Sequence, residues 1–234
     1  MVVDKIYDLV SELPPCRLTL MSWVKDGSHV LEFGTATGYM TRYLSQVKGC
    51  RVTGFEYSPE AAELAAAYCE QIIVGDIEDA SLWDQLSSSY DAIMLGDVLE
   101  HLRDPASVMV RCHNLLSQNG RLIISVPNIA HWTIRWDLLW GKFNYTETGL
   151  LDNTHVHFFT EQSFREMIKQ TGYEIEKIET SKYAYPGDRF WPKYRLTRII
   201  KKRVLKNNHH LFFNKMFPKA VAWQYLACCR RQTV

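Results

Sequence analysis

The sequence predicts an α/β protein with a doubly wound, mostly parallel sheet that has helices on both faces. Two observations predict it: short apolar strands alternate with helical segments, and a glycine turn joins the first strand to the helix that follows. Alternation of this kind is typical of parallel sheets, because each parallel pair of strands needs a crossover connection. The 234 residues have the length of one such domain with additions.

The expected elements follow one another in a regular order. Strands are expected at 28–33, 51–56, 71–74, 91–95 and 121–126, and helices at 38–47, 59–69 and 105–116, with a short helical stretch at 80–86. Ser58-Pro59 is a typical helix start, with serine as the N-cap and proline at the first position. Residues 1–24 are expected to form a helical cap that Pro14-Pro15 interrupts.

The glycine turn between the first strand and helix is the most informative segment. Residues 30–38 read Val-Leu-Glu-Phe-Gly-Thr-Ala-Thr-Gly. Glycine permits a sharp turn and close approach of a ligand to the backbone. The spacing differs from the G-x-G-x-x-G of dinucleotide folds, and Glu32 would repel a pyrophosphate but attract an ammonium group. A glycine loop without a ligand is the alternative interpretation.

Acidic residues also end the next two strands. Glu56 follows the second strand, where a carboxylate can accept hydrogen bonds from a ribose diol. Asp76 follows the third strand and could accept from an adenine amino group, with Ile77 covering the ring. In a parallel sheet these strand ends meet at one edge, where ligands bind. An ordinary solvated strand end is the alternative for each acid.

As a set, these segments resemble the class I S-adenosylmethionine-dependent methyltransferases of small molecules, among them those of sugar, polysaccharide and natural-product pathways. The resemblance covers roughly residues 25–180 and lies in 30–38, Gly54–Ser58, Gly75–Ile77, Tyr90–Pro105 and Leu115–Asn128. It implies a Rossmann-like sheet of seven strands with the last one antiparallel, and S-adenosylmethionine as cofactor, released as S-adenosylhomocysteine. One departure is Ala36, where the family usually has glycine. The implied donor-binding residues are Glu32, Gly34, Thr35, Ala36, Gly38, Glu56, Tyr57, Asp76, Ile77, Gly96, Asp97, Val98 and His101.

Residues 128–160 are expected to form an insert on the acceptor side. Trp132, Trp136 and Trp140 are spaced to share one helix face, which either packs on the core or walls the acceptor. The segment Asp152–Thr160 resembles one in which the histidine before an aromatic pair faces the acceptor. His155 is therefore the first candidate base or acceptor-orienting group, followed by His157 and Asp152; a purely structural role is the alternative.

The end of the chain is expected to close the sheet with an antiparallel pair. Thr160 is a predicted N-cap for a helix that runs to about Gln170. Residues 173–180 alternate as a half-exposed strand, and a last strand is expected at 220–229. The intervening basic amphipathic insert at 184–218 either packs on its own domain or docks on an anionic membrane surface or on a phosphorylated or lipid-linked acceptor.

Charge, apolar runs and cysteine spacing exclude several classes of protein for this chain. The net charge of +1 argues against a general nucleic-acid binder. The N-terminus has no signal-peptide pattern, and no apolar run reaches the length of a membrane span, so a cytoplasmic location is expected. The six cysteines form no C-x-x-C or zinc pattern, which predicts free thiols and no metal site.

The sequence therefore predicts a single methyltransferase domain over residues 1–234 that methylates a small molecule, with oxygen favoured over nitrogen. Its oligomeric state is left open. One rival is a nicotinamide-dependent dehydrogenase, which the turn spacing disfavours. Another is a non-catalytic relative that binds the donor and acts as a scaffold.

Overall fold

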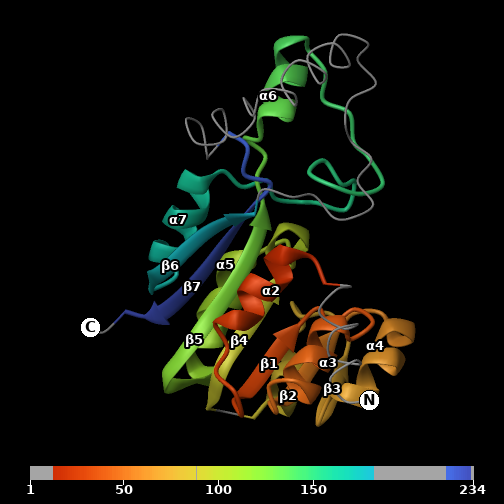
Figure 1. Cartoon of the computed structure of the whole chain (residues 1–234), viewed down its shortest axis with the longest axis vertical. Helices are drawn as coiled ribbons and strands as arrows, with labels where there is room; N and C mark the ends of the chain where they lie inside the picture. The colour runs from red at the N-terminus through yellow and green to blue at the C-terminus, as the bar shows by residue number, and fades with distance from the viewer. Residues whose placement is uncertain (1–12, 88, 182–219, 233–234) are drawn as a thin grey trace, which may run out of the picture.

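A computed structural model describes residues 13–87, 89–181 and 220–232 (Figure 1). Its centre is one seven-stranded sheet of order β3-β2-β1-β4-β5-β7-β6. The first five strands are parallel, and β7 is antiparallel to both of its neighbours. The strands are β1 His29–Phe33, β2 Arg51–Glu56, β3 Gln71–Val74, β4 Tyr90–Gly96, β5 Leu116–Pro127, β6 Tyr173–Ser181 and β7 Gln224–Arg231. The predicted fold class is confirmed.

Helices cover both faces of this sheet. The helices on the sheet are α2 Pro15–Ser22, α3 Tyr39–Gln46, α4 Pro59–Ala65, α5 Pro105–Leu115 and α7 Glu161–Gln170, and α6 Trp132–Leu139 lies beyond its edge. In Figure 1, α2 crosses the near face of the sheet and α5 lies behind it. No helix of the described ranges is long and apolar enough to cross a bilayer.

Two apolar cores follow from the alternation of side chains along the strands. On one face, Leu31 and Ile93 pack in a cluster with Val108 of α5 and Phe164 of α7. Their chain neighbours point the other way: Val30 and Met94 join Leu20 of α2 and Leu44 of α3. The sheet is therefore buried on both faces, which leaves its carboxyl edge as the place for a ligand.

Several predicted boundaries need correction. Strand β5 begins at Leu116, which pairs with Tyr90 before the register shifts, so residues 116–120 belong to the strand rather than to a turn. The helix expected at 59–69 ends at Ala65 and continues as a 3₁₀ turn over Ala66–Tyr68. The stretch at 80–86 is a 3₁₀ helix over Ala80–Gln85.

The ends of the chain also differ from expectation. Strand β7 spans Gln224–Arg231 rather than 220–229, because its pairing with β5 starts at Gln224 opposite Pro127. Of the predicted cap, α2 begins at Pro15, and residues 1–12 lie outside the described part. The basic insert at 184–218 also lies outside it. The six cysteines are free thiols, as predicted.

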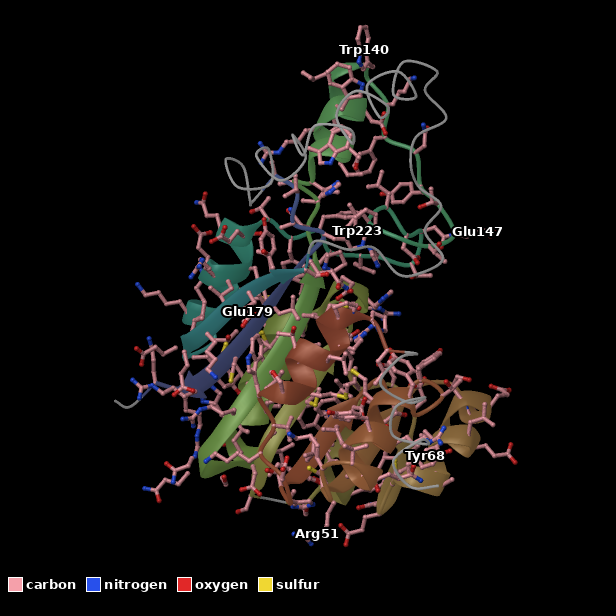
Figure 2. The ribbon with its side chains drawn as sticks, viewed as in Figure 1. Arg51, Tyr68, Trp140, Glu147, Glu179 and Trp223 are labelled. Atoms are coloured by element: carbon pink, nitrogen blue, oxygen red, sulfur yellow. The ribbon has the colours of Figure 1, made fainter. Side chains whose placement is uncertain are left out.

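The tryptophan face of α6 does not pack on the core. Trp136 is 50% exposed and Trp140 is 67% exposed, and the helix projects beyond the carboxyl edge of the sheet, with Trp140 at its far end (Figures 1 and 2). Only Ile134 of this helix is buried, against Leu150 and Leu151. The structure contradicts the first alternative, packing of this face on the core, because the helix extends away from the sheet; the acceptor wall stays a prediction.

Candidate functional site

The turn between β1 and α3 is built from three residues in the left-handed region of the backbone. Gly34, Ala36 and Gly38 have φ of +70°, +47° and +82°. A Cβ on Gly34 would lie 2.9 Å from Val98, and one on Gly38 would lie 2.8 Å from the Cα of Ala65. The two glycines are therefore required by both conformation and space. Ala36 adopts the same conformation at the cost of about 1 kcal/mol of backbone strain.

Glu56 braces this turn from the neighbouring strand. Its carboxylate accepts hydrogen bonds from the backbone N–H of Ala36 at 2.7 Å and of Ser58 at 3.0 Å. An ionised carboxylate has about four lone-pair sites, so two hydrogen bonds leave capacity for a diol. Tyr57, directly after Glu56, is exposed. Glu56, the residue predicted to bind the ribose, thus also fixes the shape of the turn.

Glu32 lies beneath the turn and is fully buried. Its Oε2 accepts a hydrogen bond from the Thr41 hydroxyl at 2.7 Å, and among the described residues its Oε1 has no partner. Burial raises the pKa of this carboxyl from 4.5 to about 7, against the lowering effects of the Thr41 hydrogen bond and of the Arg17 charge. Glu32 is thus a half-satisfied acceptor at the end of β1, two residues before Gly34. Thr35 is likewise buried, and its hydroxyl has no partner in the described structure.

The third strand ends in the expected acid. Asp76 is exposed and accepts a hydrogen bond from the N–H of Glu78 at 2.9 Å. Ile77 is buried, and its carbonyl accepts from the indole of Trp83 at 2.7 Å. Backbone hydrogen bonds from Gly34 to Phe55 and from Gly75 to Glu56 place the ends of β1, β2 and β3 side by side. The structure therefore brings the predicted donor residues of these three strands together.

Asp97, at the end of β4, is held by three other elements. Its carboxylate accepts from Arg17 of α2 at 2.6 Å, from the Ser125 hydroxyl of β5 at 2.7 Å and from the Gln224 amide of β7 at 2.8 Å. Asp97 has φ of +57°, which these contacts stabilise. Gly96 before it leaves no room for a Cβ, which would lie 2.7 Å from the Arg17 guanidinium. No sequence pattern predicted the contacts that Arg17, Ser125 and Gln224 make with Asp97.

A second group of side chains lies just beyond Asp97. The short turn Leu99–His101 after β4 supplies Glu100 and His101, and the insert supplies His155. The rings of His101 and His155 meet edge to face with centroids 4.9 Å apart. Burial lowers the pKa of His155, the nearby His101 lowers it further, and Asp152 opposes both. Glu100 is a residue that the sequence analysis missed, although it stands directly before His101.

Hydrogen bonds hold the insert over this strand end. The backbone carbonyl of Glu100 accepts from the N–H of Val156 at 2.7 Å and of His157 at 3.0 Å. The His157 ring contacts the carbonyl of Arg103 at 3.1 Å, outside the His101–His155 pair. His155 and His157 thus have different surroundings.

Asp152 shapes the loop that carries His155. Its carboxylate accepts from both the N–H and the hydroxyl of Thr154, at 2.8 and 2.6 Å. The Thr154 hydroxyl contacts Nδ1 of His101 at 3.1 Å. Asp152 is therefore linked to the His101 imidazole through the Thr154 hydroxyl.

Aromatic side chains continue from His155 toward solvent. Phe158 lies 6.2 Å from the His155 ring, 6.0 Å from Phe143 and 6.3 Å from Tyr145, measured between centroids. We call Phe143, Tyr145 and Phe158 the aromatic wall. Phe143 and Tyr145 are exposed, so the wall offers an apolar surface beside the histidines.

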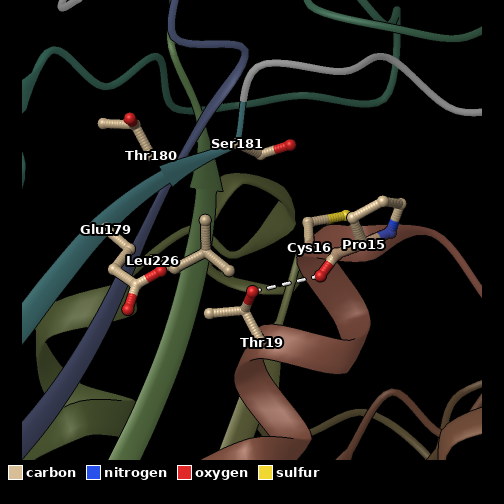
Figure 3. A pocket seen from close by; sticks show the side chains of 7 residues that line it. All are labelled: Pro15, Cys16, Thr19, Glu179, Thr180, Ser181 and Leu226. Atoms are coloured by element: carbon tan, nitrogen blue, oxygen red, sulfur yellow. Dashed lines mark hydrogen bonds between the residues drawn. The ribbon is translucent and has the colours of Figure 1, made fainter.

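A separate hollow lies between α2 and the end of β6 (Figure 3). Its volume is about 170 Å³, and Cys16, Thr19, Glu179, Ser181 and Leu226 are among its lining residues. Ligand pockets usually have about 300–1,000 Å³. This hollow is therefore too small for a drug-sized acceptor, and it contains none of the predicted site residues.

The sheet order, the left-handed turn and the acids at successive strand ends define an α/β enzyme that binds a nucleoside cofactor at its carboxyl edge. A family model described as a methyltransferase domain matches residues 8–178. A ubiquinone biosynthesis O-methyltransferase of Xylella fastidiosa is 32% identical over 179 residues, which cover 73% of this chain and 72% of that protein. The chain belongs to this methyltransferase family and is an S-adenosylmethionine-dependent methyltransferase. The dehydrogenase alternative is thereby wrong.

Other relatives differ in length and chemistry. A sphingolipid C9-methyltransferase of Candida albicans is 25% identical over 205 residues, covering 80% of this chain and 39% of that protein. Ubiquinone biosynthesis O-methyltransferases of Xanthomonas oryzae are 30% identical, and the chain spans 51% of their length. The chain therefore spans only part of several curated relatives.

Solved structures show the same fold at low identity. A methyltransferase from Archaeoglobus fulgidus superposes with a TM-score of 0.61 at 14% identity, covering 92% of each chain. A Burkholderia thailandensis 1,6-didemethyltoxoflavin-N1-methyltransferase, solved with S-adenosylhomocysteine, gives 0.57 at 17% identity, covering 94% of this chain and 77% of that one. These likenesses establish the fold alone.

Proposed function

We propose that this enzyme transfers a methyl group from S-adenosylmethionine to a hydroxyl group of a small apolar or aromatic molecule. The observation that carries the proposal is the position of His155, which lies against His101 at the end of β4 and against the aromatic wall. An O-methyltransferase among the relatives supports oxygen as the acceptor atom. Transfer to nitrogen, or donor binding without catalysis, is the alternative.

The donor is assigned to the turn and to the strand ends around it. We assign the ammonium group to Oε1 of Glu32, the ribose hydroxyls to Glu56 and the adenine to Asp76 and Ile77. Gly34, Thr35, Ala36 and Gly38 form the floor of the site, with Tyr57 at its rim. The segment Gly96, Asp97, Val98 and His101 is assigned to the side that faces the transferred methyl group.

The reaction itself mainly requires alignment. The bound donor would supply an electrophilic methyl group for in-line attack by the acceptor oxygen, with S-adenosylhomocysteine as the leaving group and the hydroxyl proton passing to solvent. Fixing donor and acceptor in line accounts for a large part of such rate enhancements. We assign to His155 the orientation of the acceptor hydroxyl. His157 and Asp152, through their contacts with Arg103 and Thr154, position the loop that carries His155.

The rest of the molecule is proposed to support this role. The insert at 128–160 would form the acceptor side of a single domain, with residues 1–24 as a helical cap. The reaction is assigned to the cytoplasm, with no nucleic-acid partner. A membrane surface, bound through the basic residues at 184–218, is the alternative partner.

A transfer assay with methyl-labelled donor tests the proposal. The protein is incubated with labelled S-adenosylmethionine and matched phenols, alkyl alcohols, sugars and aromatic amines. We expect label in phenols or apolar alcohols, as base-stable methyl ethers identified by mass spectrometry. Exclusive labelling of amines would favour the nitrogen alternative. Binding of donor without turnover on any acceptor would favour the non-catalytic alternative.

A further inference from the structure

Glu100, His101 and His155 form a cluster in which only His101 has been assigned to the donor side. Each offers one ligand atom, and these atoms all lie within 4.8 Å of one another. The first two come from the turn after β4, and the third comes from the insert more than fifty positions later. Two histidines and a glutamate form a ligand set found in catalytic zinc sites.

The burial of Glu100 is the second observation. The residue is 1% exposed, and within the described ranges neither of its carboxylate oxygens has a hydrogen-bond partner. Nδ1 of His155 is buried and, in the same part of the chain, also without a hydrogen bond. A buried carboxylate without a partner is costly, and a bound cation removes that cost.

We propose that Glu100, His101 and His155 bind one divalent transition-metal cation, for which Zn²⁺ is the best match. Zinc ligands lie about 2.0–2.2 Å from the ion, so the cluster must contract on binding. His101 is exposed and can approach the other two by side-chain rotation. The absence of any metal-binding spacing in the sequence is consistent with ligands that only folding brings together.

The position of the cluster also suggests a role for the ion. Three protein ligands leave an open coordination position, which is how catalytic zinc sites receive water or substrate. An acceptor hydroxyl in that position would be acidified by the ion. His155 would then orient the hydroxyl through the cation. This role rests on the proposed function, whereas metal binding stands on the three side chains alone.

Metal titration of the full chain tests the inference. Protein freed of metal with a chelator is titrated with Zn²⁺ by calorimetry and with Co²⁺ by visible absorption. We expect one ion per chain and, for Co²⁺, the absorption bands of a nitrogen- and oxygen-ligated site. Glu100→Gln and His155→Ala should each weaken Zn²⁺ binding by at least about 100-fold, since even changes to outer-shell partners cost about 10–100-fold.

His29→Ala is the control, because this imidazole lies at the start of β1 against the ring of Tyr90, at the opposite end of the strand from the cluster. It should leave the affinity for Zn²⁺ unchanged. Binding of S-adenosylhomocysteine and thermal melting show whether each variant is folded. If Glu100→Gln does not fold, His155→Ala tests the site by itself, because His155 lies in a loop. No Zn²⁺ binding by the parent, or parent-like Zn²⁺ affinity in both ligand variants, would overturn the site while leaving methyl transfer testable. Metal binding without methyl transfer would count against the proposed function instead.

Discussion

The guanidinium of Arg17 lies 2.6 Å from the carboxylate of Asp97, which is 80 positions away in the sequence. The pair links α2 to the end of β4, and both side chains are largely shielded, with 4% and 15% of their surface exposed. Because Asp97 follows β4 and precedes the turn that carries Glu100 and His101, this contact links the N-terminal helix to that strand end. It is a structural element of the site that no motif identifies.

Removing the Arg17 charge should destabilise the protein strongly. We expect Arg17→Met to lower the free energy of unfolding by about 3–5 kcal/mol, because it leaves a shielded carboxylate without its counter-charge. Lys48→Met is the control: its partner Asp26 is 80% exposed, so the loss should stay below about 1 kcal/mol. Urea unfolding measures both. Equal effects would mean that the Arg17–Asp97 pair is not a structural contact.

Adding a methyl group at Gly38 should disrupt the donor turn. Strain from the left-handed backbone and overpacking against Ala65 should together cost about 2–4 kcal/mol and abolish tight donor binding. Gly49→Ala separates the two causes, since Gly49 has φ of +62° but nothing within 4 Å of the added Cβ. It should cost about 1 kcal/mol from strain alone and leave donor affinity unchanged. Calorimetric titration with S-adenosylhomocysteine checks both; full affinity in Gly38→Ala would contradict the assigned turn.

Donor affinity should depend on pH through Glu32, whose pKa is raised to about 7 by burial. An ammonium group favours the ionised carboxylate, so affinity should rise about tenfold between roughly pH 6 and pH 8. Glu32→Gln should remove this part of the dependence and leave only that of the donor's own amino group. Calorimetry in buffers of different ionisation enthalpy would detect the proton released. Identical profiles for parent and variant would exclude a contact between Glu32 and the ammonium group.

The same carboxyl should make stability decrease as pH rises. Its folded pKa of about 7 lies above its ordinary value of 4.5, so the folded protein binds more protons than the unfolded chain between these values. Unfolding free energy should therefore fall by about 3 kcal/mol across that window, relative to Glu32→Gln. Denaturant unfolding of both proteins at several pH values measures the difference. A difference that does not change with pH would show that Glu32 has an ordinary pKa.

Loss of the His155 imidazole should impair turnover but not donor binding. We expect His155→Ala to lower kcat by about 100-fold, the scale of a misplaced acceptor, with the donor Kd unchanged. His157→Ala should change kcat much less, since its ring contacts a backbone carbonyl outside the cluster. Single-turnover kinetics with labelled donor distinguish the two. A parent-like kcat in His155→Ala would remove this residue from the mechanism.

Local sequence patterns were sufficient to predict most strands of the sheet and several of its helices. Strands β1 to β4 and helices α3, α5 and α7 begin and end within a residue or two of their predicted bounds, because apolar runs, caps and turns are encoded by neighbouring residues. Ser58 and Thr160 act as N-caps as predicted, the latter in a capping box with Ser163. The strand-end acids Glu32, Glu56 and Asp76 could be found for the same reason: a parallel sheet places successive strand ends at one edge.

Errors arose where long-range packing decides the outcome. The start of β5 depends on where Leu116 meets Tyr90, and the start of β7 depends on where Gln224 meets Pro127. The tryptophans of α6 have the spacing of a buried face, but the direction of the helix leaves Trp136 and Trp140 exposed. Spacing along a helix says which residues share a face, not what that face contacts.

The sequence by itself determined the class of sheet, the turn from Glu32 to Gly38 and the acids that surround it, because each depends on residues close together in the chain. The tertiary structure alone decided that Arg17 holds Asp97 and that Glu100 and His101 meet His155. These contacts join segments 80 and more than fifty positions apart, and no local periodicity encodes them. The residues proposed to bind the donor could therefore be found from motifs, whereas those proposed for the acceptor depend on how the insert folds back over β4.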